Sequence, residues 1–529
     1  MKRKLNSLIM ALFFLQVVIT TSCRENLLET VPTDRISTDV FWKTEQDATS
    51  TANAIYNYLE SGELFLWDGF SDIAHINTTG ATEAVIDMGS YDAQNARIAQ
   101  QWSNAYAGIR AANYFLENVD KVPTSNTTLI NSLKGQVKTL RAYFYLRLVS
   151  WFGDVPLITK TITIEEAQQV KRDNVSDIYN FIHAELTEAA SLLPAAQTDK
   201  GRITKGAALA LDARAMLYAG RYREAADAAK SVMDLKQYSL YTKYQDLFSY
   251  AAENNSEVII DKEFIMDIYS NAVFHNFAPS SQATSLPNAV PTKQGADMYE
   301  MKSTGKIISD PNSGFDPYNP YNDRDPRMRY SMYVPGDVLP DGTVFRSIPG
   351  SGTADAVGGG NLNATRTGYN FKKYINKEDL AHPSNCGINI ILLRYAEVLL
   401  TYAESKIELN EIDQSVFDAI NAVRQRSDVN MPPINSPKTQ TEMRDIVRRE
   451  RTVELAFEGL HVFDIRRWKT AASVMPGAVQ GITYVKDGKL VTVTDNSFVR
   501  SFDPNRDYLW PIPQQELILD KNLVQNPGW

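Results

Sequence analysis

Residues 441–468 carry the densest group of side chains in this sequence that could perform acid–base chemistry. Glu450, Glu454 and Glu458 are spaced four residues apart, so a continuous helix would place their carboxylates on one face. Two carboxyl groups held about 5 to 10 Å apart across a cleft can hydrolyse a glycosidic bond. On this interpretation the chain is a carbohydrate-active enzyme that uses residues such as Glu450 and Glu454.

The same stretch also fits a purely structural role, which we favour. Stacked carboxylates repel one another unless cations neutralise them, and four arginines lie nearby in the sequence. These candidate cations are Arg448, Arg449, Arg466 and Arg467. Core-type residues surround the charges: Met443, Ile446, Val447, Val453, Leu455 and Phe457. We therefore predict an ion-pair network that fixes a helix from Thr441 to Phe457, continuing to Trp468.

Sugar recognition is the second chemistry that the residues allow. A sugar ring stacks its apolar face on an aromatic side chain, and its hydroxyl groups need amide, carboxylate or backbone partners. Aromatic residues stand beside such partners in the segments Phe65–Asn95 and Phe274–Tyr321. The candidate ligand-binding residues are Trp67, Asp68, Tyr91, Asn95, Phe274, His275, Asn276, Tyr318 and Asn319. For each of them, filling the core is the alternative role, and we predict that role for Trp102, Trp151 and Trp468.

Metal, cofactor and nucleophile motifs are not evident in the sequence. The five histidines are scattered without the spacing of a zinc site, and Gly358–Gly360 lacks the lysine of a phosphate-binding loop. No GxSxG motif is present. Asp310–Gly314 only partly matches a calcium loop. We predict no catalytic residue, no cofactor and no catalytic metal, and a structural cation stays an open alternative.

The first 23 residues have the layout of a bacterial lipoprotein signal. Lys2, Arg3 and Lys4 precede an apolar run from Leu8 to Thr20, and small residues lead to Cys23. We predict that residues 1–22 are removed and that Cys23 is acylated and anchored in outer-membrane lipid. The alternatives are an ordinary secretory signal cleaved near Ser22, or a single anchoring helix, for which the apolar run is short.

Charge and cysteine content narrow the class of protein further. The chain carries 54 Lys and Arg against 63 Asp and Glu, a net charge of −9, and loss of the three leader cations would make it −12. This balance does not favour nucleic acid as a partner. Acylation of Cys23 would leave Cys386 unpaired, so stability must come from a large core rather than from disulfides.

The hydrophobic periodicity predicts a mostly α protein, with residues 23–529 as a single domain. Helical parts are expected at about 34–253 and 390–470, with a C-terminal hairpin and tail at 471–529. Two tight helix pairs, Thr204–Ala219 with Tyr222–Met233 and Ile391–Leu409 with Gln414–Arg426, are lined by alanine. Such pairs are typical of tetratricopeptide-like units, and a generic helical hairpin is the alternative.

Between about residues 254 and 389 the helical pattern disappears. Glycine, proline, asparagine and serine replace it, but aromatic residues remain frequent, which argues against disorder. We predict ordered loops and short strands that form a ligand-binding region on the helical scaffold. A further hairpin is expected between Tyr484 and Val493.

Several motifs, in order along the chain, resemble the SusD/RagB family of Bacteroidetes outer-membrane lipoproteins. The most specific is RRERTVELAFEGLHVFDIRRW at Arg448–Trp468. Others are LETVPTDRISTDVFWKTEQDA at Leu28–Ala48, TLRAYFYLRLVSWFGDVPL at Thr139–Leu157, RDPRM at Arg324–Met328, LLRYAEVLLTYAES at Leu392–Ser405, INAVRQR at Ile420–Arg426 and LWPIPQQEL near the C-terminus.

The resemblance implies a SusD-like fold and a specific role. Members of this family are lipid-anchored in the outer membrane, face the outside, bind glycans and act with a SusC-like TonB-dependent transporter, generally without being enzymes. The resemblance also implies that Arg448–Trp468 is scaffold. The chain departs from the family pattern in having only Glu25 as an acidic residue just after Cys23. Peptide is the alternative cargo on the same fold.

Overall fold

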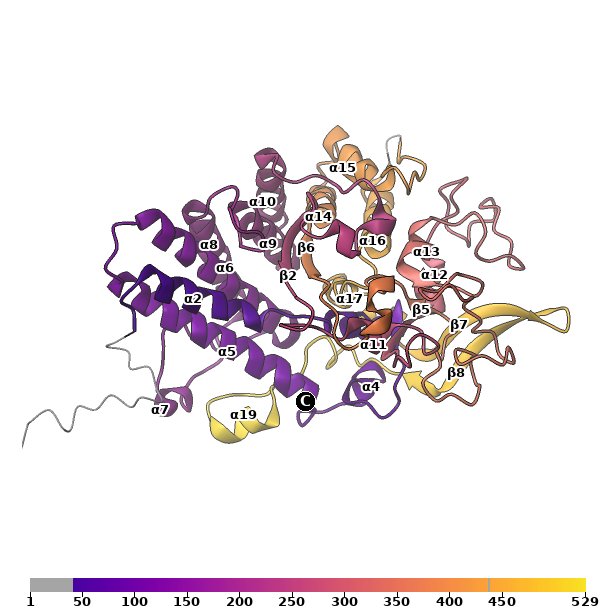
Figure 1. Cartoon of the computed structure of the whole chain (residues 1–529), viewed down its shortest axis with the longest axis horizontal. Coiled ribbons are helices and arrows are strands. Elements are labelled where there is room, and N and C mark those ends of the chain that lie inside the picture. The colour runs from indigo at the N-terminus through magenta and orange to yellow at the C-terminus, as the bar shows by residue number, and fades with distance from the viewer. Residues whose placement is uncertain (1–40, 436–437) are drawn as a thin grey trace, which may run out of the picture.

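A computed structural model of the chain describes residues 41–435 and 438–529. The predicted signal peptide and Cys23 lie outside these ranges. Helices dominate, and the mostly α class predicted from the sequence is confirmed (Figure 1). The helices are α2 (Glu45–Ile55), α3 (Leu64–Trp67), α4 (Thr82–Asp87), α5 (Ala96–Asn118), α6 (Thr127–Phe152), α7 (Ile164–Ala167), α8 (Val175–Leu192), α9 (Lys205–Tyr218), α10 (Tyr222–Leu235), α11 (Val273–Phe277), α12 (Lys293–Asp297), α13 (Arg327–Ser331), α14 (Tyr395–Glu408), α15 (Gln414–Arg424), α16 (Gln440–Glu454), α17 (His461–Arg467), α18 (Ala471–Val474) and α19 (Gln514–Leu519).

The strands are short, apart from one C-terminal hairpin. They are β1 (Ala74–Ile76), β2 (Val258–Lys262), β3 (Ala289–Pro291), β4 (Met332–Tyr333), β5 (Asn370–Phe371), β6 (Ile390–Arg394), β7 (Gly477–Lys486) and β8 (Lys489–Arg500). They form four two-stranded antiparallel ladders, β1–β3, β2–β6, β4–β5 and β7–β8. The first three ladders tie together segments that lie far apart in the sequence.

The long helices pack as one continuous array. Each contacts the next: α5 on α6, α6 on α8, α8 on α9, α9 on α10, α10 on α14, and α14 on both α15 and α16. Buried alanines such as Ala207, Ala225 and Ala403 let neighbouring helices approach closely. Gly220, with a φ of 71°, makes the turn between α9 and α10. Both predicted helix pairs are therefore present, as α9–α10 and α14–α15.

Two predicted helices differ from the structure. Ile390–Arg394 is the buried strand β6, because its run of four apolar residues is compatible with a strand or a helix and pairing with β2 decides the outcome. The helix predicted through Trp468 ends at Glu454, and α17 starts a new direction at His461. Phe457 and Gly459 have positive φ values of 63° and 74° in the turn between them. Glu458 is consequently not on the face that carries Glu450 and Glu454.

The region between residues 254 and 389 is built from ordered loops and short elements, as predicted. Its elements β2 and α11 lie near the middle of Figure 1, and α12, α13 and β5 lie toward the right, close to the β7–β8 hairpin. That hairpin is longer than predicted and turns at Asp487 and Gly488, whose φ values of 51° and 74° are typical of a type I′ turn. One hydrophobic core extends from Trp42 to Ile512 and joins the loops to the helices. None of the helices in the described ranges combines the length and apolar composition of a membrane span.

Candidate functional site

The glutamates with helical spacing form a buried ion-pair network. Arg327, Arg394 and Arg426 place their guanidinium nitrogens 2.7 to 2.9 Å from the carboxylate oxygens of Glu454. Glu450 lies 2.6 Å from Arg327 and 2.7 Å from Arg424. All of these side chains are buried. The structural role predicted for the cluster is therefore supported, and no cleft separates the carboxylates.

The cations that neutralise this network are not the ones predicted from sequence proximity. They come from Arg327, Arg394, Arg424, Arg426 and Lys373, brought in from α13, β6, the α15 region and the loop after β5. The arginines close in sequence point elsewhere. Arg448 pairs with Glu408, Arg449 with Glu300 and Arg467 with Glu404, and Arg466 has no carboxylate within 4.0 Å in the described chain. Residues adjacent to a glutamate on a helix project in other directions, which is the physical reason for the error.

The electrostatics around Glu454 also argue against proton transfer by this residue. Burial alone would raise the pKa of Glu454, but Arg426, Arg394 and Arg327 hold that pKa far below its ordinary value. A general acid must be protonated near the working pH, and Glu454 stays ionised there. The catalytic alternative thus lacks the geometry that it needs at both glutamates, and Glu454 also stays ionised where a general acid must carry a proton.

The first predicted sugar-binding segment is part of the core. Trp67 is fully buried, donates its indole N–H to Glu60 Oε1 at 2.8 Å, and packs against Trp151 and Trp510 at ring distances of 5.7 and 6.3 Å. It offers no face to a ligand. The same indole ring that could stack on a sugar fills the space between helices here, so its assignment to the binding site is wrong.

Its predicted neighbours have structural roles too. Asp68 is buried and accepts the backbone N–H groups of Gly459 and His461, each at 3.0 Å, and burial raises its pKa to about 6. Asn95 caps the first turn of α5 by accepting from Ile98 N at 3.3 Å. Tyr91 is buried 4.7 Å from the ring of Trp529. Because Asp68, Asn95 and Tyr91 are buried and have structural contacts, their assignments to the binding site are also wrong.

The second predicted segment, Phe274–Tyr321, contains both buried and exposed candidate residues. Phe274 is fully buried in the core, so its assignment is also wrong. Tyr318 is 56% exposed, and Asn319 is bonded to Asp316 in the same exposed loop. His275 is partly exposed, and its backbone N–H is bonded to Pro383 O at 2.9 Å. Only Asn276 lines the cavity described next.

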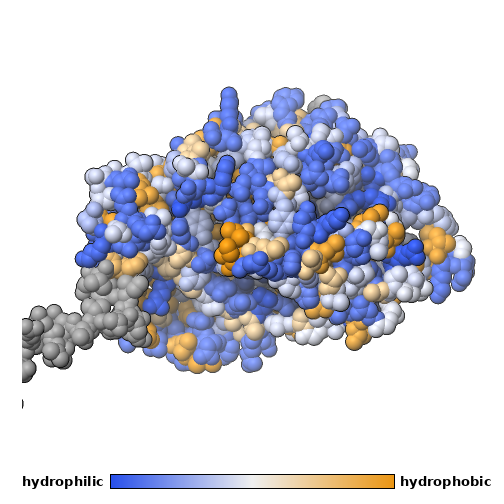
Figure 2. All heavy atoms as spheres, viewed as in Figure 1, coloured by the Kyte–Doolittle hydropathy of each residue, from blue (hydrophilic) through white to orange (hydrophobic). Residues whose placement is uncertain are grey.

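That cavity, of about 500 Å³, lies where the loop after β2, helix α11 and the segment after α2 meet. The face of the molecule that carries α4 and α11 is mainly hydrophilic and is hollowed near its centre, with a hydrophobic patch beside the hollow (Figure 2). We call the cavity of about 500 Å³ the Tyr269 cavity. Side chains that line it include Ser61, Glu63, Arg97, Tyr269, Asn276 and Asn288.

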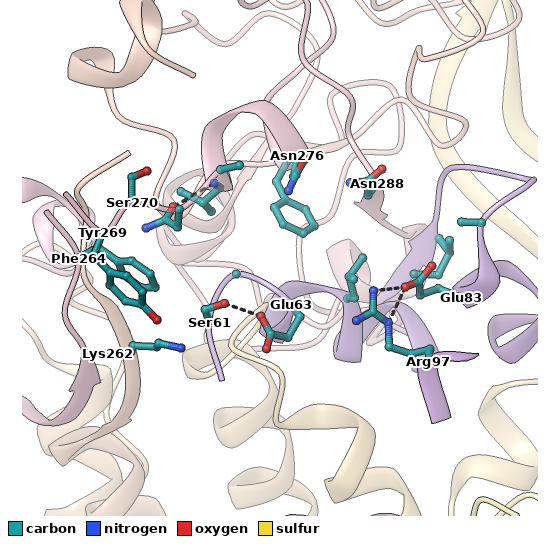
Figure 3. A pocket seen from close by; sticks show the side chains of 18 residues that line it. Ser61, Glu63, Glu83, Arg97, Lys262, Phe264, Tyr269, Ser270, Asn276 and Asn288 are labelled. Atoms are coloured by element: carbon teal, nitrogen blue, oxygen red, sulfur yellow. Dashed lines mark hydrogen bonds and ion pairs between the residues drawn. The ribbon is translucent and has the colours of Figure 1, made fainter. Parts of the chain in front are cut away.

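One wall of the Tyr269 cavity is an aromatic platform. The rings of Phe264 and Tyr269 stack at 5.3 Å with only 6° between their planes, and Lys262 Nζ lies 5.8 Å from each ring (Figure 3). Phe264 is buried behind Tyr269, which is 43% exposed. The platform therefore presents one flat aromatic face to the solvent, backed by a second ring that fixes its orientation.

The platform sits on a tight loop that the rest of the fold holds in place. Ile265 and Tyr269 exchange backbone hydrogen bonds of 2.8 and 2.9 Å, and Asp267 between them adopts a positive φ of 66°. Asn385 bonds both the backbone and the side chain of Asp267, at 3.0 and 2.6 Å. Ile268 at the tip is 80% exposed, an unusual position for an apolar side chain. The loop thus offers apolar surface at the rim of a polar cavity.

Polar groups occupy the remaining walls (Figure 3). Arg97 and Glu83 form an ion pair, with Arg97 Nε 2.6 Å from Glu83 Oε1, across the cavity from the platform. Glu63 accepts one hydrogen bond, from Ser61 Oγ at 2.5 Å. The side-chain amide of Asn276 has no hydrogen-bond partner among the described residues. These groups can bond hydroxyl groups of a bound molecule while an apolar face stacks on Tyr269.

Most of this cavity was not identified from the sequence. Phe264 and Tyr269 belong to the aromatic-rich region that the sequence marks as ordered, and their spacing of five residues across a short loop is the one signal that points to them. Glu63, Arg97 and Lys262 carried no local signal, because they come from three separate elements that only the fold brings together.

A smaller hollow of about 270 Å³ adjoins the Tyr269 cavity and shares Lys262 and Tyr269 with it. Asp261 lines this hollow beside Glu263 and has no cation within 4.0 Å in the described chain. Burial, reinforced by the charges of Glu263 and Glu253, raises the pKa of Asp261 to about 7. In the described ranges, this hollow included, no group of three or more His, Cys, Asp or Glu side chains is arranged to hold a metal ion.

Comparison with known proteins identifies the family. Residues 237–529 match the model described as "SusD family", and residues 31–217 match the one described as "Starch-binding associating with outer membrane". SusD-like protein P2 of Formosa agariphila is 25% identical over 545 aligned positions, covering 98% of this chain and 99% of the relative.

Solved structures with the same fold extend over nearly the whole chain. A SusD-like carbohydrate binding protein from Bacteroides fragilis is 28% identical with a TM-score of 0.84, covering 92% of this chain and 100% of the other. A second SusD-like protein of Bacteroides fragilis is 26% identical with a TM-score of 0.82, covering 94% and 100%. With the family model matched over residues 237–529, the chain belongs to the SusD family.

Proposed function

We propose that this protein captures glycan at the Tyr269 cavity while anchored in the outer membrane through acylated Cys23, and delivers it to a SusC-like TonB-dependent transporter for uptake. The observation that carries the binding step is that the exposed face of Tyr269 and the side-chain amide of Asn276, which has no hydrogen-bond partner among the described residues, line the same cavity. This combination meets the requirement of a sugar, which has one apolar face and a rim of hydroxyl groups.

The comparisons support a carbohydrate ligand and an outer-membrane location. The relative from Bacteroides fragilis is named as a carbohydrate binding protein, and the model matched by residues 31–217 is described as starch-binding and associated with the outer membrane. The lipid anchor at Cys23 and the transporter partner rest on the sequence motifs and the family resemblance.

A binding role rather than an enzymatic one fits the chemistry of the described residues. The carboxylates that sequence spacing suggested for hydrolysis are held by arginines inside the core. In the Tyr269 cavity, Glu83 is paired with Arg97, and Glu63 is the lining carboxylate that has no cation within 4.0 Å among the residues the structure describes. Hydrolysis of a glycoside ordinarily requires two carboxyl groups with distinct protonation states.

A binding assay on purified protein tests the proposal. A panel of neutral oligosaccharides would be titrated into the wild type, into Tyr269→Ala and into Tyr318→Ala, with calorimetry as readout and product analysis on the same samples. Tyr318→Ala is the matched control, because it removes an exposed tyrosine from a loop outside the cavity. We expect Tyr269→Ala to lose about 1 to 2 kcal/mol of binding free energy, roughly 5- to 30-fold in affinity, and Tyr318→Ala to bind like the wild type.

Three results would contradict the proposal. Loss of affinity in Tyr318→Ala with none in Tyr269→Ala would move the site to the other loop. Release of shortened sugars would make the protein an enzyme. Binding of a peptide mixture with no response to any glycan would replace the cargo class.

A further inference from the structure

Another hollow contains several positively charged side chains, and its lining residues lie far in the sequence from those of the Tyr269 cavity. It has a volume of about 730 Å³ and lies between the C-terminal end of α6, the start of α8, the α9–α10 turn, α17 and the C-terminal tail. Its cationic lining residues are Arg172, Arg221, Arg466, Arg467 and Lys469. Asp154 is its one lining carboxylate. We call it the Arg466 hollow.

Most of this charge is not neutralised by the protein. Arg467 is paired with Glu404 and Asp464. The other four cations have no carboxylate within 4.0 Å in the described parts of the chain. Arg172 instead donates to carbonyl and amide oxygens, including Val524 O at 2.7 Å. In a protein of net charge −9, such a local excess of cations is unexpected.

Arg466 is the clearest case. It is 9% exposed, donates to Val462 O at 3.2 Å, and its Nε has no hydrogen-bond partner in the described chain. Its guanidinium carbon lies 5.4 Å from the Trp151 ring. Burial lowers its pKa, and nearby Asp507 is already bound to Arg506 at 2.8 Å. A buried unpaired donor on a cation costs free energy, so its presence beside an open hollow points to a missing anionic partner.

Aromatic rings line the same hollow. The hydroxyl of Tyr218 is also buried without a partner among the described residues. Lys469 Nζ lies 4.2 Å from the ring centre of Tyr508, a partly exposed residue that also lines the hollow. Among the described residues, the hollow therefore combines four cations without a carboxylate partner, a tyrosine hydroxyl without a hydrogen-bond partner and a partly exposed aromatic ring.

We infer that the Arg466 hollow binds an acidic saccharide, with a carboxylate or sulfate group held by Arg466, Arg221 and Lys469 and the sugar ring against Tyr508. Arginine suits this role because its planar fork matches the two oxygens of a carboxylate or sulfate. The anionic part of the inference stands on the charges alone. The saccharide part rests on the proposed function, and the two sites share no lining residue.

Three small probes separate the contributions of charge and ring. Glucuronate has both the carboxylate and the sugar ring, acetate has the carboxylate alone, and glucose has the ring alone. Each would be titrated into the wild type, into the double variant Arg221→Gln/Lys469→Gln, and into Arg466→Gln. Lys489→Gln is the matched control, since it removes one exposed cation at the turn of the β7–β8 hairpin.

We expect glucuronate to bind the wild type and Lys489→Gln equally, at least tenfold more tightly than acetate or glucose. Both hollow variants should lose this preference. Without ligand, the double variant should unfold at the same or a higher temperature than the wild type, because repulsion between cations is relieved. A purely structural role for these cations would instead lower that temperature.

Other outcomes would overturn the inference. Acetate binding as tightly as glucuronate would make this an anion site without saccharide specificity, and no binding of glucuronate would remove the site. Unchanged glucuronate affinity in both hollow variants would place binding elsewhere. Tyr269→Ala distinguishes the two proposals, because it should leave glucuronate binding intact while neutral glycan binding falls.

Discussion

The buried network around Glu454 and the Tyr269 cavity both contain arginine and glutamate side chains, but they differ in whether polar and aromatic groups stay free to bind a ligand. In the network, three arginines surround Glu454 and each carboxylate oxygen is bonded within the protein. In the cavity, Tyr269 shows an open face and the amide of Asn276 has no partner among the described residues. The network contains far more charge, yet the carboxylate oxygens of Glu450, Glu454 and Glu458 are all bonded to cations of the protein itself.

This difference shows that the density of reactive residues is a poor guide to a functional site. What distinguishes the cavity is hydrogen-bonding and stacking capacity that the protein itself does not use. A cluster that satisfies itself stabilises the fold, and a cluster that does not is available to a ligand. The following predictions test each side of this contrast.

The largest effect should come from breaking the network. Glu454→Gln leaves Arg327, Arg394 and Arg426 buried without the charge that balances them, and we expect a loss of about 3 to 5 kcal/mol in the free energy of unfolding. Urea denaturation followed by circular dichroism measures this loss. At temperatures where the variant is folded, its glycan affinity should equal that of the wild type.

An exposed ion pair provides the control for this experiment. Glu411 pairs with Arg223 at the surface, so Glu411→Gln should change the free energy of unfolding by at most about 1 kcal/mol. If Glu454→Gln were equally mild, the network would not be the structural element that the geometry indicates.

A smaller and pH-dependent effect is expected at Asp261, a buried carboxylate without a cation. Its pKa is about 7 in the fold and near 4 in the unfolded chain, so the folded state retains the proton that the unfolded state releases. The stabilisation from this group is complete below about pH 4 and is lost as the pH rises to 7, with an upper bound of about 4 kcal/mol.

Asp261→Asn should remove this dependence. The difference in unfolding free energy between the variant and the wild type should grow from pH 4.5 to pH 7 and then level off, as measured by urea denaturation at each pH. Parallel stability curves for the two proteins would show that Asp261 is ionised in the fold. In that case Asp261 would resemble Glu454, a buried carboxylate that stays ionised in the fold.

The smallest effect separates two asparagines that both line the Tyr269 cavity. Asn276→Ala should cost about 1 kcal/mol of glycan-binding free energy with no loss of stability, because its amide bonds nothing else in the described chain. Asn271 bonds Ile388 O at 2.9 Å and Val273 N at 3.0 Å. Asn271→Ala should therefore lower stability, and affinity per folded molecule should be affected less. If instead Asn276→Ala lowered stability and Asn271→Ala lowered affinity, Asn271 would be the ligand-binding residue and Asn276 the structural one.

The sequence was a good guide wherever local pattern decides structure. The helices α5, α6, α8, α9 and α10, the loop-rich region and the C-terminal hairpin follow from periodicity, capping residues and turn residues. It was a poor guide to burial. Trp67 and Phe274 lie among aromatic and polar neighbours like those of Tyr269, but only Tyr269 reaches the surface.

The sequence by itself determined the helical scaffold, the family and the scaffold role of Arg448–Trp468, because these depend on short-range spacing and on motifs that can be read directly. The tertiary structure decided which cations neutralise Glu454, which aromatic rings stay exposed and which amide stays unpaired. Those properties depend on contacts between segments up to several hundred residues apart. A side chain's chemistry is set by its residue type, but whether that chemistry is available to a ligand is set by what packs against it.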